Sequence, residues 1–231
     1  MDEPLTQQLL DKVKAYKMPP AAIELLTKHQ PLIIAGASGV GKETIIRAIQ
    51  DSSRGAKVVT HTTRHPREGE HNGVDYWFVT QPRMIELIEE ESFIEVKAIH
   101  NQQVSGSSLA AYQTIVDEGQ HPLLALDVQG IEEVRHHVLG LKPVFILPPN
   151  FEAWMERLEG RGEMSHTERL RRLDSAKDEL QRALDDEHFM LVVNHDVNQA
   201  AQEILQNVSD PATQAQNRDV AQKLIHSINA Y

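Results

Sequence analysis

Gly36-Ala37-Ser38-Gly39-Val40-Gly41-Lys42-Glu43-Thr44 is the stretch that decides the fold of this 231-residue chain. The apolar run 32–35 precedes it and the helical pattern 45–49 follows it, which is the order of strand, glycine-rich turn and helix in a phosphate-binding loop. The glycines let several backbone N–H groups face one anion, the helix adds the positive end of its dipole, and Lys42 adds a full charge. The loop therefore predicts an α/β protein that binds a polyphosphate.

The loop departs from the usual pattern at one position. A hydroxyl normally follows the lysine and binds Mg²⁺, but here Glu43 follows and the hydroxyl comes one residue later, in Thr44. We expect Thr44, water or the Glu43 carboxylate to meet the metal. A glycine-rich turn without a ligand is the alternative interpretation, and three glycines in register with a lysine disfavour it.

Composition narrows the class of protein. A content of 40% hydrophobic and 25% charged residues is ordinary for a globular protein, and the absence of cysteine excludes disulfides and cysteine-based zinc sites. A net charge of −11 argues against a broad nucleic-acid surface. The chain has no run of roughly 20 apolar residues, as a membrane helix needs, and Met1-Asp2-Glu3-Pro4 does not resemble a signal peptide. We expect a cytoplasmic protein without nucleic-acid or membrane partners, and the sequence does not indicate its oligomeric state.

A second loop carries paired arginines. A strand begins at 58–60 and leads into Thr62-Thr63-Arg64-His65-Pro66-Arg67-Glu68-Gly69-Glu70. Arg64 and Arg67 lie three residues apart, with Pro66 restricting the backbone between them, so two forked donors can face one phosphate. A solvated basic turn is the alternative.

The segments after this loop predict a small mixed subdomain, inserted after the first helix of the core. The expected elements are an Asn72-Gly73 type I′ hairpin with a strand to Phe78, a helix at 82–91, a strand at 93–96, a polar loop at 101–108 and a helix at 109–118.

Three further apolar runs predict buried parallel strands, at 123–130, 144–147 and 189–194. The first of them ends in Asp127, where open α/β sheets bind ligands. A helical stretch at 154–184 is broken at Gly160-Arg161-Gly162, and five arginines around the break suggest a lid over phosphates. A solvated helix pair with glutamate partners is the alternative. The termini predict two short amphipathic helices at 1–29, and a polar linker from Ser209 with a helix at 220–228.

Taken together, the motifs resemble the guanylate kinase family, which transfers a phosphoryl group from ATP to GMP. The resemblance runs from about Pro31 to about Val208 and rests on GASGVGK (36–42), TTRHPREGEHNGVDY (62–76), FIE (93–95), LDVQG (126–130), ILPP (146–149), RLEGRG (157–162) and VVN (192–194). It implies a three-layer P-loop nucleoside monophosphate kinase fold with a parallel core sheet. The implied domain division is an N-terminal helical extension (1–29), a guanylate kinase-like domain (30–208) with a mixed α+β GMP-binding subdomain (59–108) and a helical lid (157–172), and a C-terminal linker and helix (209–231).

The same resemblance implies a set of site residues. Those for ATP are Gly36, Ala37, Ser38, Gly39, Val40, Gly41, Lys42, Glu43, Thr44 and Asn194. Those for GMP are Thr60, Arg64, Arg67, Glu70, Tyr76, Glu95, Ser107 and Asp127. The implied catalytic residues are Lys42, Arg157, Arg161 and Arg172. Mg²⁺ with ATP is the implied cofactor, and Thr44 and Glu43 are its candidate ligands. A fixed carboxylate suits guanine, because guanine carries N–H donors where adenine presents an acceptor.

Three positions differ from the family pattern and keep alternatives open. They are Glu43, Ala125 in place of an acid, and the segment Gln102–Ser107, which lacks a tyrosine pair. The expected function is Mg-ATP:GMP phosphotransfer without a covalent intermediate. The alternatives are a nucleoside monophosphate kinase with altered or weak acceptor use, and a non-catalytic guanylate kinase-like binding module.

Overall fold

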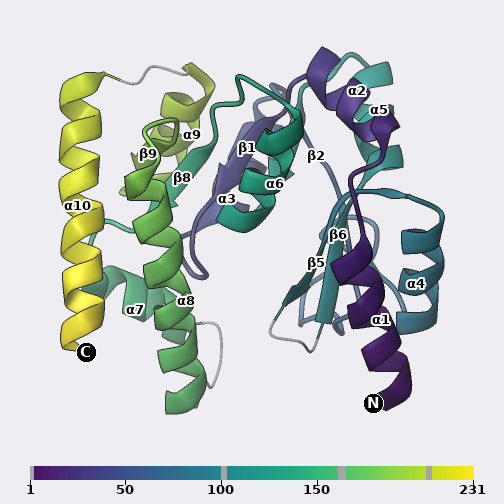
Figure 1. The fold of residues 1–231 in the computed structure, drawn as a ribbon. Helices are drawn as coiled ribbons and strands as arrows, with labels where there is room; N and C mark the ends of the chain where they lie inside the picture. Colours follow the sequence, from purple (N-terminus) through teal and green to yellow (C-terminus); the bar gives the residue numbers. More distant parts are fainter. Residues whose placement is uncertain (1–2, 100–102, 161–164, 207–209) are drawn as a thin grey trace. The chain divides into compact units, whose positions relative to one another are not determined.

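The computed structural model describes residues 3–99, 103–160, 165–206 and 210–231, and Figure 1 shows its helices and strands. The chain forms two compact units. The first consists of Met1–Pro31, Ala56–Leu124 and Glu132–Gly140, and the second of Leu32–Gly55, Ala125–Ile131 and Leu141–Tyr231. Within the described ranges, no helix is both long enough and apolar enough to cross a membrane.

The first unit is built on a four-stranded mixed sheet in the order β4-β3-β6-β5. Strand β6 pairs antiparallel with β3 and β5, and β3 pairs parallel with β4. Its elements are α1 (Glu3–Ala15), α2 (Pro20–Lys28), β2 (Ala56–Lys57), β3 (Thr60–Thr62), β4 (Trp77–Phe78), α4 (Gln81–Glu89), β5 (Phe93–Ile99), β6 (Gln103–Ser108) and α5 (Leu109–Asp117).

Helix α1 is part of the core of this unit. Leu9 is 2% exposed and joins a cluster with Met84 and Ile88 of α4 and Phe93 of β5. Figure 1 shows α1 running beside α4. The N-terminal helices predicted at 1–29 are therefore confirmed as elements, and the first of them shields apolar side chains that would otherwise face water.

The second unit carries strands β1 (Leu32–Ala35), β8 (Val144–Leu147) and β9 (Met190–Val193), in which β1–β8 and β8–β9 pair in parallel. The five-stranded sheet has the order β2-β7-β1-β8-β9, where β7 is Pro122–Ala125 and also pairs parallel with β2. Its helices are α3 (Lys42–Asp51), α7 (Phe151–Glu159), α8 (His166–Asp185), α9 (Val197–Gln206) and α10 (Pro211–Ala230). Helix α6 (Val128–His137) follows β7. The α/β fold class with a parallel core sheet is confirmed.

Polar side chains cap the N-termini of helices α7, α8 and α10. Asn150 accepts from the Ala153 N–H at α7, Ser165 from the Glu168 N–H at α8, and Asp210 from the Thr213 N–H at α10. Each cap satisfies an N–H group that has no partner inside its helix, which stabilises the start by about 1 kcal/mol.

Helix α10 packs on α8 and on β9, the last strand of its sheet; Figure 1 shows α10 running alongside α8. Gln214 accepts from the Leu191 N–H at 2.9 Å and donates to the Leu191 carbonyl at 3.0 Å. Asn217 donates to the same carbonyl at 2.7 Å. The prediction of a linker from Ser209 with a helix at 220–228 was wrong in extent, since the helix begins at Pro211.

The predicted Asn72-Gly73 hairpin was wrong. A type I′ turn needs positive φ at both central residues, whereas only Gly73 has it, at 79°. The Asn72 side chain instead accepts from the Phe78 N–H at 2.8 Å. Residues 73–75 form a turn, and the strand β4 contains only Trp77 and Phe78.

The predicted polar loop at 101–108 was also wrong for the described part of that segment. Gln103–Ser108 forms strand β6, which lies between β3 and β5; residues 101 and 102 lie outside the described ranges. The predicted strand at 58–60 was shifted, because β2 ends at Lys57 and β3 begins at Thr60.

Candidate active site

The glycine-rich loop connects β1 to α3 in the second unit. Gly39 and Gly41 have φ angles of 87° and 93°, a region that residues with a Cβ rarely adopt. A Cβ on Gly39 would come within 2.8 Å of Leu158 Cδ2, and one on Gly41 would collide with the Asn194 side chain. Both glycines are therefore required by backbone angle and by space.

Side chains of the second unit that are far from this loop in the sequence donate hydrogen bonds to two of its backbone carbonyls. Trp154 Nε1 donates to the Ser38 carbonyl at 2.8 Å. Asn194 Nδ2 and an Arg157 nitrogen donate to the Val40 carbonyl at 2.8 Å and 3.3 Å. Because the peptide unit is planar, fixing the carbonyls on one side directs the N–H groups of the same peptides to the other. The loop is thus shaped by its surroundings as well as by its glycines.

Lys42 and Asn194 lie where the loop meets its first helix and its sheet. Lys42 Nζ donates to the Gly36 carbonyl at 3.2 Å, so the side chain reaches back across the loop. Asn194 is 2% exposed, and its Oδ1 atom has no hydrogen-bond partner among the described residues. A buried acceptor without a partner is costly unless a ligand or water completes it.

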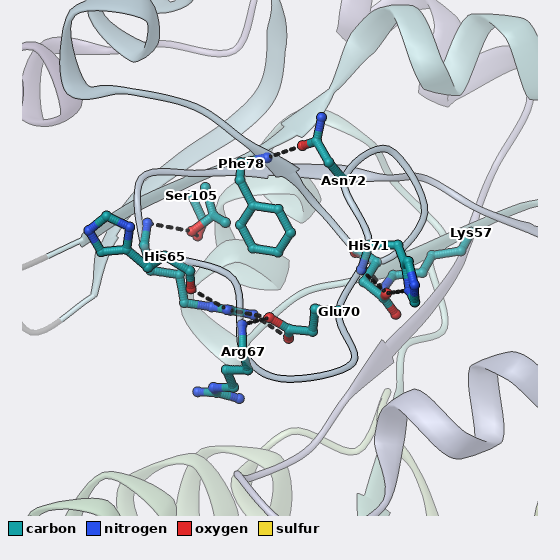
Figure 2. Close-up of polar contacts among 11 residues, drawn as sticks. Lys57, His65, Arg67, Glu70, His71, Asn72, Phe78 and Ser105 are labelled. Atoms are coloured by element: carbon teal, nitrogen blue, oxygen red, sulfur yellow. Dashed lines mark hydrogen bonds and ion pairs between the residues drawn. The ribbon is translucent and has the colours of Figure 1, made fainter.

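The second loop, in the first unit, is organised around one carboxylate. Glu70 accepts two hydrogen bonds from the Arg64 guanidinium, at 2.6 Å and 2.7 Å, and a third from the Arg67 backbone N–H at 2.7 Å. Figure 2 shows the Glu70 carboxylate against the Arg67 backbone, while the Arg67 side chain points away from it. These hydrogen bonds, that from Arg64 first, lower the pKa of Glu70 to about 2.

Aromatic rings support the same guanidinium. The Arg64 Cζ atom lies 4.7 Å from the centroid of the Tyr76 ring and 5.4 Å from that of Phe78, which is cation–π geometry. Lys57 Nζ lies 5.0 Å from the Tyr76 centroid and donates to the Asp75 carbonyl at 3.2 Å. The cations of Arg64 and Lys57 thus both lie over the Tyr76 ring.

Glu95 and Ser107 form a buried polar pair on neighbouring strands of the first unit. Ser107 is 1% exposed and donates to Glu95 Oε1 at 2.7 Å; Glu95 is 7% exposed. Burial raises the pKa of Glu95, against the opposing effect of the Ser107 hydrogen bond. Thr60 pairs with Ser107 across β3 and β6, so its backbone adjoins the pair.

The arginines expected in a lid differ in what they contact. Besides its bond to the P-loop, Arg157 donates to the Asn194 carbonyl at 3.1 Å. Arg172 and Arg171 both pair with Glu168, at 2.8 Å and 2.5 Å, and Arg169 pairs with Glu159 at 3.0 Å. The alternative of a helix face with glutamate partners therefore holds for the pairs on α8, and Arg161 lies outside the described residues.

Asp127 belongs to the second unit and acts as a helix cap. Its Oδ1 atom accepts from the Gly130 N–H at 2.9 Å, and the Ile131 N–H donates to its carbonyl at 3.0 Å. The structure thus groups the predicted residues in two sets, P-loop with Arg157, Asn194 and Asp127 in one unit, and the remaining GMP residues in the other.

Comparisons with known proteins show the family of this chain. A family model described as guanylate kinase matches residues 28–210. The guanylate kinase of Schizosaccharomyces pombe is 35% identical over 188 residues, which cover 79% of this chain and 92% of that protein. This chain belongs to the guanylate kinase family. The guanylate kinase of Neisseria gonorrhoeae is 36% identical over 183 residues, 79% of this chain and 88% of that protein.

A solved guanylate kinase shares the fold. The crystal structure of guanylate kinase from Anaplasma phagocytophilum superimposes with a TM-score of 0.59, at 24% identity over 80% of this chain and 86% of that one. The family model begins at residue 28 and ends at residue 210, so both α1 and α10 lie outside it.

Within this guanylate kinase fold, three departures from the family pattern can now be located. Glu43 and Thr44 occupy the first turn of α3, and Ala125 ends β7. Ser105 stands directly before Gly106, within the segment that lacks a tyrosine pair, and its hydroxyl donates to Thr62 Oγ1 at 3.1 Å.

Sequence reasoning missed two supporting residues of this member of the guanylate kinase family, Lys57 and Trp154. Lys57 is the last residue of a two-residue strand and belongs to no recognisable motif. Trp154 fits the pattern of an ordinary apolar residue on the buried face of a helix. Their contacts lie 18 and 116 residues away along the chain. No local signal could have indicated these contacts.

Proposed function

We propose that this member of the guanylate kinase family catalyses the transfer of the γ-phosphoryl group of ATP to GMP, giving ADP and GDP. The observation that carries the proposal is the pre-assembled set of Arg64, Glu70 and Tyr76 in a chain that also holds a P-loop with its lysine. A scaffold that only bound a partner would not need both the arginine loop and a P-loop with its lysine.

The acceptor loop suits a nucleoside monophosphate. Glu70 holds the Arg64 fork in place, and Arg67 offers a second fork three residues along. Guanidinium groups bind phosphate through two parallel hydrogen bonds, and a fork that is already oriented loses less entropy on binding. Lys57 lies over the same Tyr76 ring as Arg64 and would add a third positive charge near the acceptor phosphate.

The buried Glu95–Ser107 pair suits the base. A carboxylate there would accept hydrogen bonds from N1 and N2 of guanine, and the hydroxyl of Ser107 orients it. Adenine has no donor at N1, so its binding would leave a buried acceptor unpaired, and that loss can discriminate strongly between bases. Asp127, which the family resemblance also assigns to GMP, stays a prediction.

The transfer itself needs positioning and charge stabilisation and no covalent intermediate. A phosphate oxygen of GMP forms a bond to the γ-phosphorus of ATP, while the bond from that phosphorus to the β,γ-bridging oxygen breaks and ADP leaves. Lys42 would hold the β- and γ-phosphates. Arg157, Arg161 and Arg172 are the residues proposed to offset charge on the transferring group. Asn194 Oδ1 would accept from the adenine amino group.

The residues present fit a magnesium ion carried with the nucleotide. Glu43 and Thr44 supply a carboxylate and a hydroxyl at the first turn of α3, and Mg²⁺ prefers such oxygen ligands together with substrate phosphates and water. No group of three acidic or histidine side chains that could hold a metal occurs in the described part of the chain, so ATP itself would provide most ligands. Bound Mg²⁺ would neutralise charge on the β- and γ-phosphates.

One assay separates the candidate functions. Purified protein with Mg-ATP is offered GMP, dGMP, AMP, UMP and CMP, and ADP formation is measured. We expect turnover with GMP above the other ribonucleotides. Turnover with a different acceptor alone would favour the altered kinase, for which Ser105 is the structural reason. Background ADP with every acceptor would leave the non-catalytic module.

A P-loop variant tests the assignment of donor and acceptor residues. Lys42→Ala should abolish turnover, because the positive charge that would hold the β- and γ-phosphates is removed. The Kd for GMP, measured by calorimetry, should stay within about twofold. A Lys57→Met protein is the comparison, since its effect should fall on GMP. Loss of GMP binding in Lys42→Ala would contradict separate sites.

A further inference from the structure

Strand β5 lies at the edge of the four-stranded sheet, next to β6 only. The Ser92 carbonyl, just before β5, accepts from the Leu109 N–H at 3.0 Å. Because a strand presents the backbone groups of successive residues to alternate sides, the N–H and C=O of Phe93 face the outer edge. Such groups must find partners elsewhere.

Tyr16 supplies both partners. Its hydroxyl donates to the Phe93 carbonyl at 2.7 Å and accepts from the Phe93 N–H at 3.2 Å. Tyr16 follows α1, and its ring packs against the apolar cluster that contains Leu9 and Phe93. Burial raises the pKa of Tyr16 to about 12, so the hydroxyl stays protonated and can donate and accept at once.

The contact lies at an irregularity that decides where Glu95 points. Phe93 pairs with Ser108, and Val96 pairs with Gly106. Between these two pairs β5 advances by three residues and β6 by only two, so β5 contains one extra residue. Such a bulge inserts one residue and reverses the alternation of faces. Phe93 and Val96 consequently both join the apolar cluster. In a regular strand Glu95 would share the face of Phe93; here it meets Ser107 instead.

We propose that Tyr16 is a positioning residue for guanine recognition, which fixes the β5 bulge through Phe93 and so holds Glu95 toward Ser107 and the base. The proposal rests on the proposed function, because it assigns guanine to Glu95. Tyr16 lies before residue 28, where the family model begins. A segment outside that model would thus set the base specificity of the kinase.

The first test removes only the hydroxyl. Tyr16→Phe keeps the ring in the apolar cluster, so the protein should fold, as circular dichroism and a cooperative thermal melt would show. The loss of two hydrogen bonds should raise the KM for GMP about fivefold to tenfold, leave the KM for ATP within about twofold, and lower the preference for GMP over AMP.

Tyr112→Phe is the matched control. Tyr112 is buried in the same unit, and its hydroxyl likewise donates to a backbone carbonyl, that of His29. This variant should lose stability and leave the KM for GMP unchanged. An equal rise in Tyr112→Phe, or no rise in Tyr16→Phe, would overturn the proposal, because the effect would then be general loosening or absent.

A double-mutant cycle asks whether Tyr16 acts through Glu95. Adding Tyr16→Phe to Glu95→Gln should change the KM for GMP by less than about twofold beyond Glu95→Gln alone, since coupled residues are not additive. Independent, multiplying effects would overturn the route through Glu95. A wild-type protein that does not use GMP would refute the proposed function itself, whereas normal GMP use with an unaffected Tyr16→Phe variant would refute only the role of Tyr16.

Discussion

Glu70 touches both arginines of the acceptor loop, one through its guanidinium and one through its backbone. Glu70→Gln keeps the shape but removes the charge that holds Arg64 for phosphate. We expect the KM for GMP to rise about tenfold, because charge-assisted hydrogen bonds contribute about 1.5–3 kcal/mol, with the KM for ATP unchanged. Steady-state kinetics with each substrate varied would measure this. Glu68→Gln, an exposed change in the same loop, should alter neither constant.

The raised pKa of Glu95 gives GMP use a pH dependence. In the proposed role the ionised Glu95 carboxylate accepts from guanine, so the KM for GMP should fall as pH rises above the ordinary glutamate value of 4.5 and through the raised pKa. The sign for stability is opposite: the folded state holds this proton more tightly than the unfolded state, so its contribution to stability decreases over the same rise.

A control is needed because the phosphate of GMP also titrates, with a second pKa of about 6. The KM profile of Glu95→Gln isolates the carboxyl group, since only the phosphate titrates there. Superimposable wild-type and variant profiles would contradict a titrating Glu95 at the base.

Helix α10 contributes to the stability of the second unit through polar side chains. Asn217 is 8% exposed and donates to the Leu191 carbonyl. Asn217→Ala should lower the free energy of unfolding by about 0.5–1.5 kcal/mol, because it removes one hydrogen bond to a carbonyl that Gln214 still reaches. Urea unfolding would measure the loss. Gln216→Ala, one residue earlier on an exposed position, should change the free energy by less than about 0.5 kcal/mol.

Elements with a local signal could be predicted, and others could not. Strand β1, the P-loop and helix α3 could be predicted, because an apolar stretch, glycines at the expected spacing and a helical period follow one another in the sequence. Strand β6 has the sequence QVSGSS, with one large apolar residue, and is a strand because β3 and β5 pair with it on both sides. Helix α10 is rich in Gln and Asn, so its first turns resemble a linker.

For the molecule as a whole, the family, the glycine-rich loop and the arginine loop could be predicted from the sequence. The side chains that hold these two loops in place could not. Trp154–Ser38, Asn194–Val40 and Tyr16–Phe93 join residues 116, 154 and 77 positions apart. Single-sequence patterns carry no information on such pairs. The sequence analysis expected the GMP residues other than Asp127 in one subdomain, 59–108, and these residues lie in the first compact unit.

The N-terminal segment outside the family model should matter for folding. Leu9 is 2% exposed among side chains of α4 and β5. Leu9→Ala should cost about 2–5 kcal/mol of stability, from lost burial and the cavity left behind. Its neighbour Gln8 is exposed, and Gln8→Ala should be nearly neutral. Thermal and urea unfolding would compare the two; equal stabilities would mean that α1 is a dispensable addition.

The side chain of Gln214 on α10 has a consequence for self-association. It bonds both the N–H and the C=O of Leu191 in the outermost strand β9, where a strand of a second molecule would otherwise add itself. Closing the β9 edge in this way disfavours the strand-to-strand pairing by which cross-β aggregates grow.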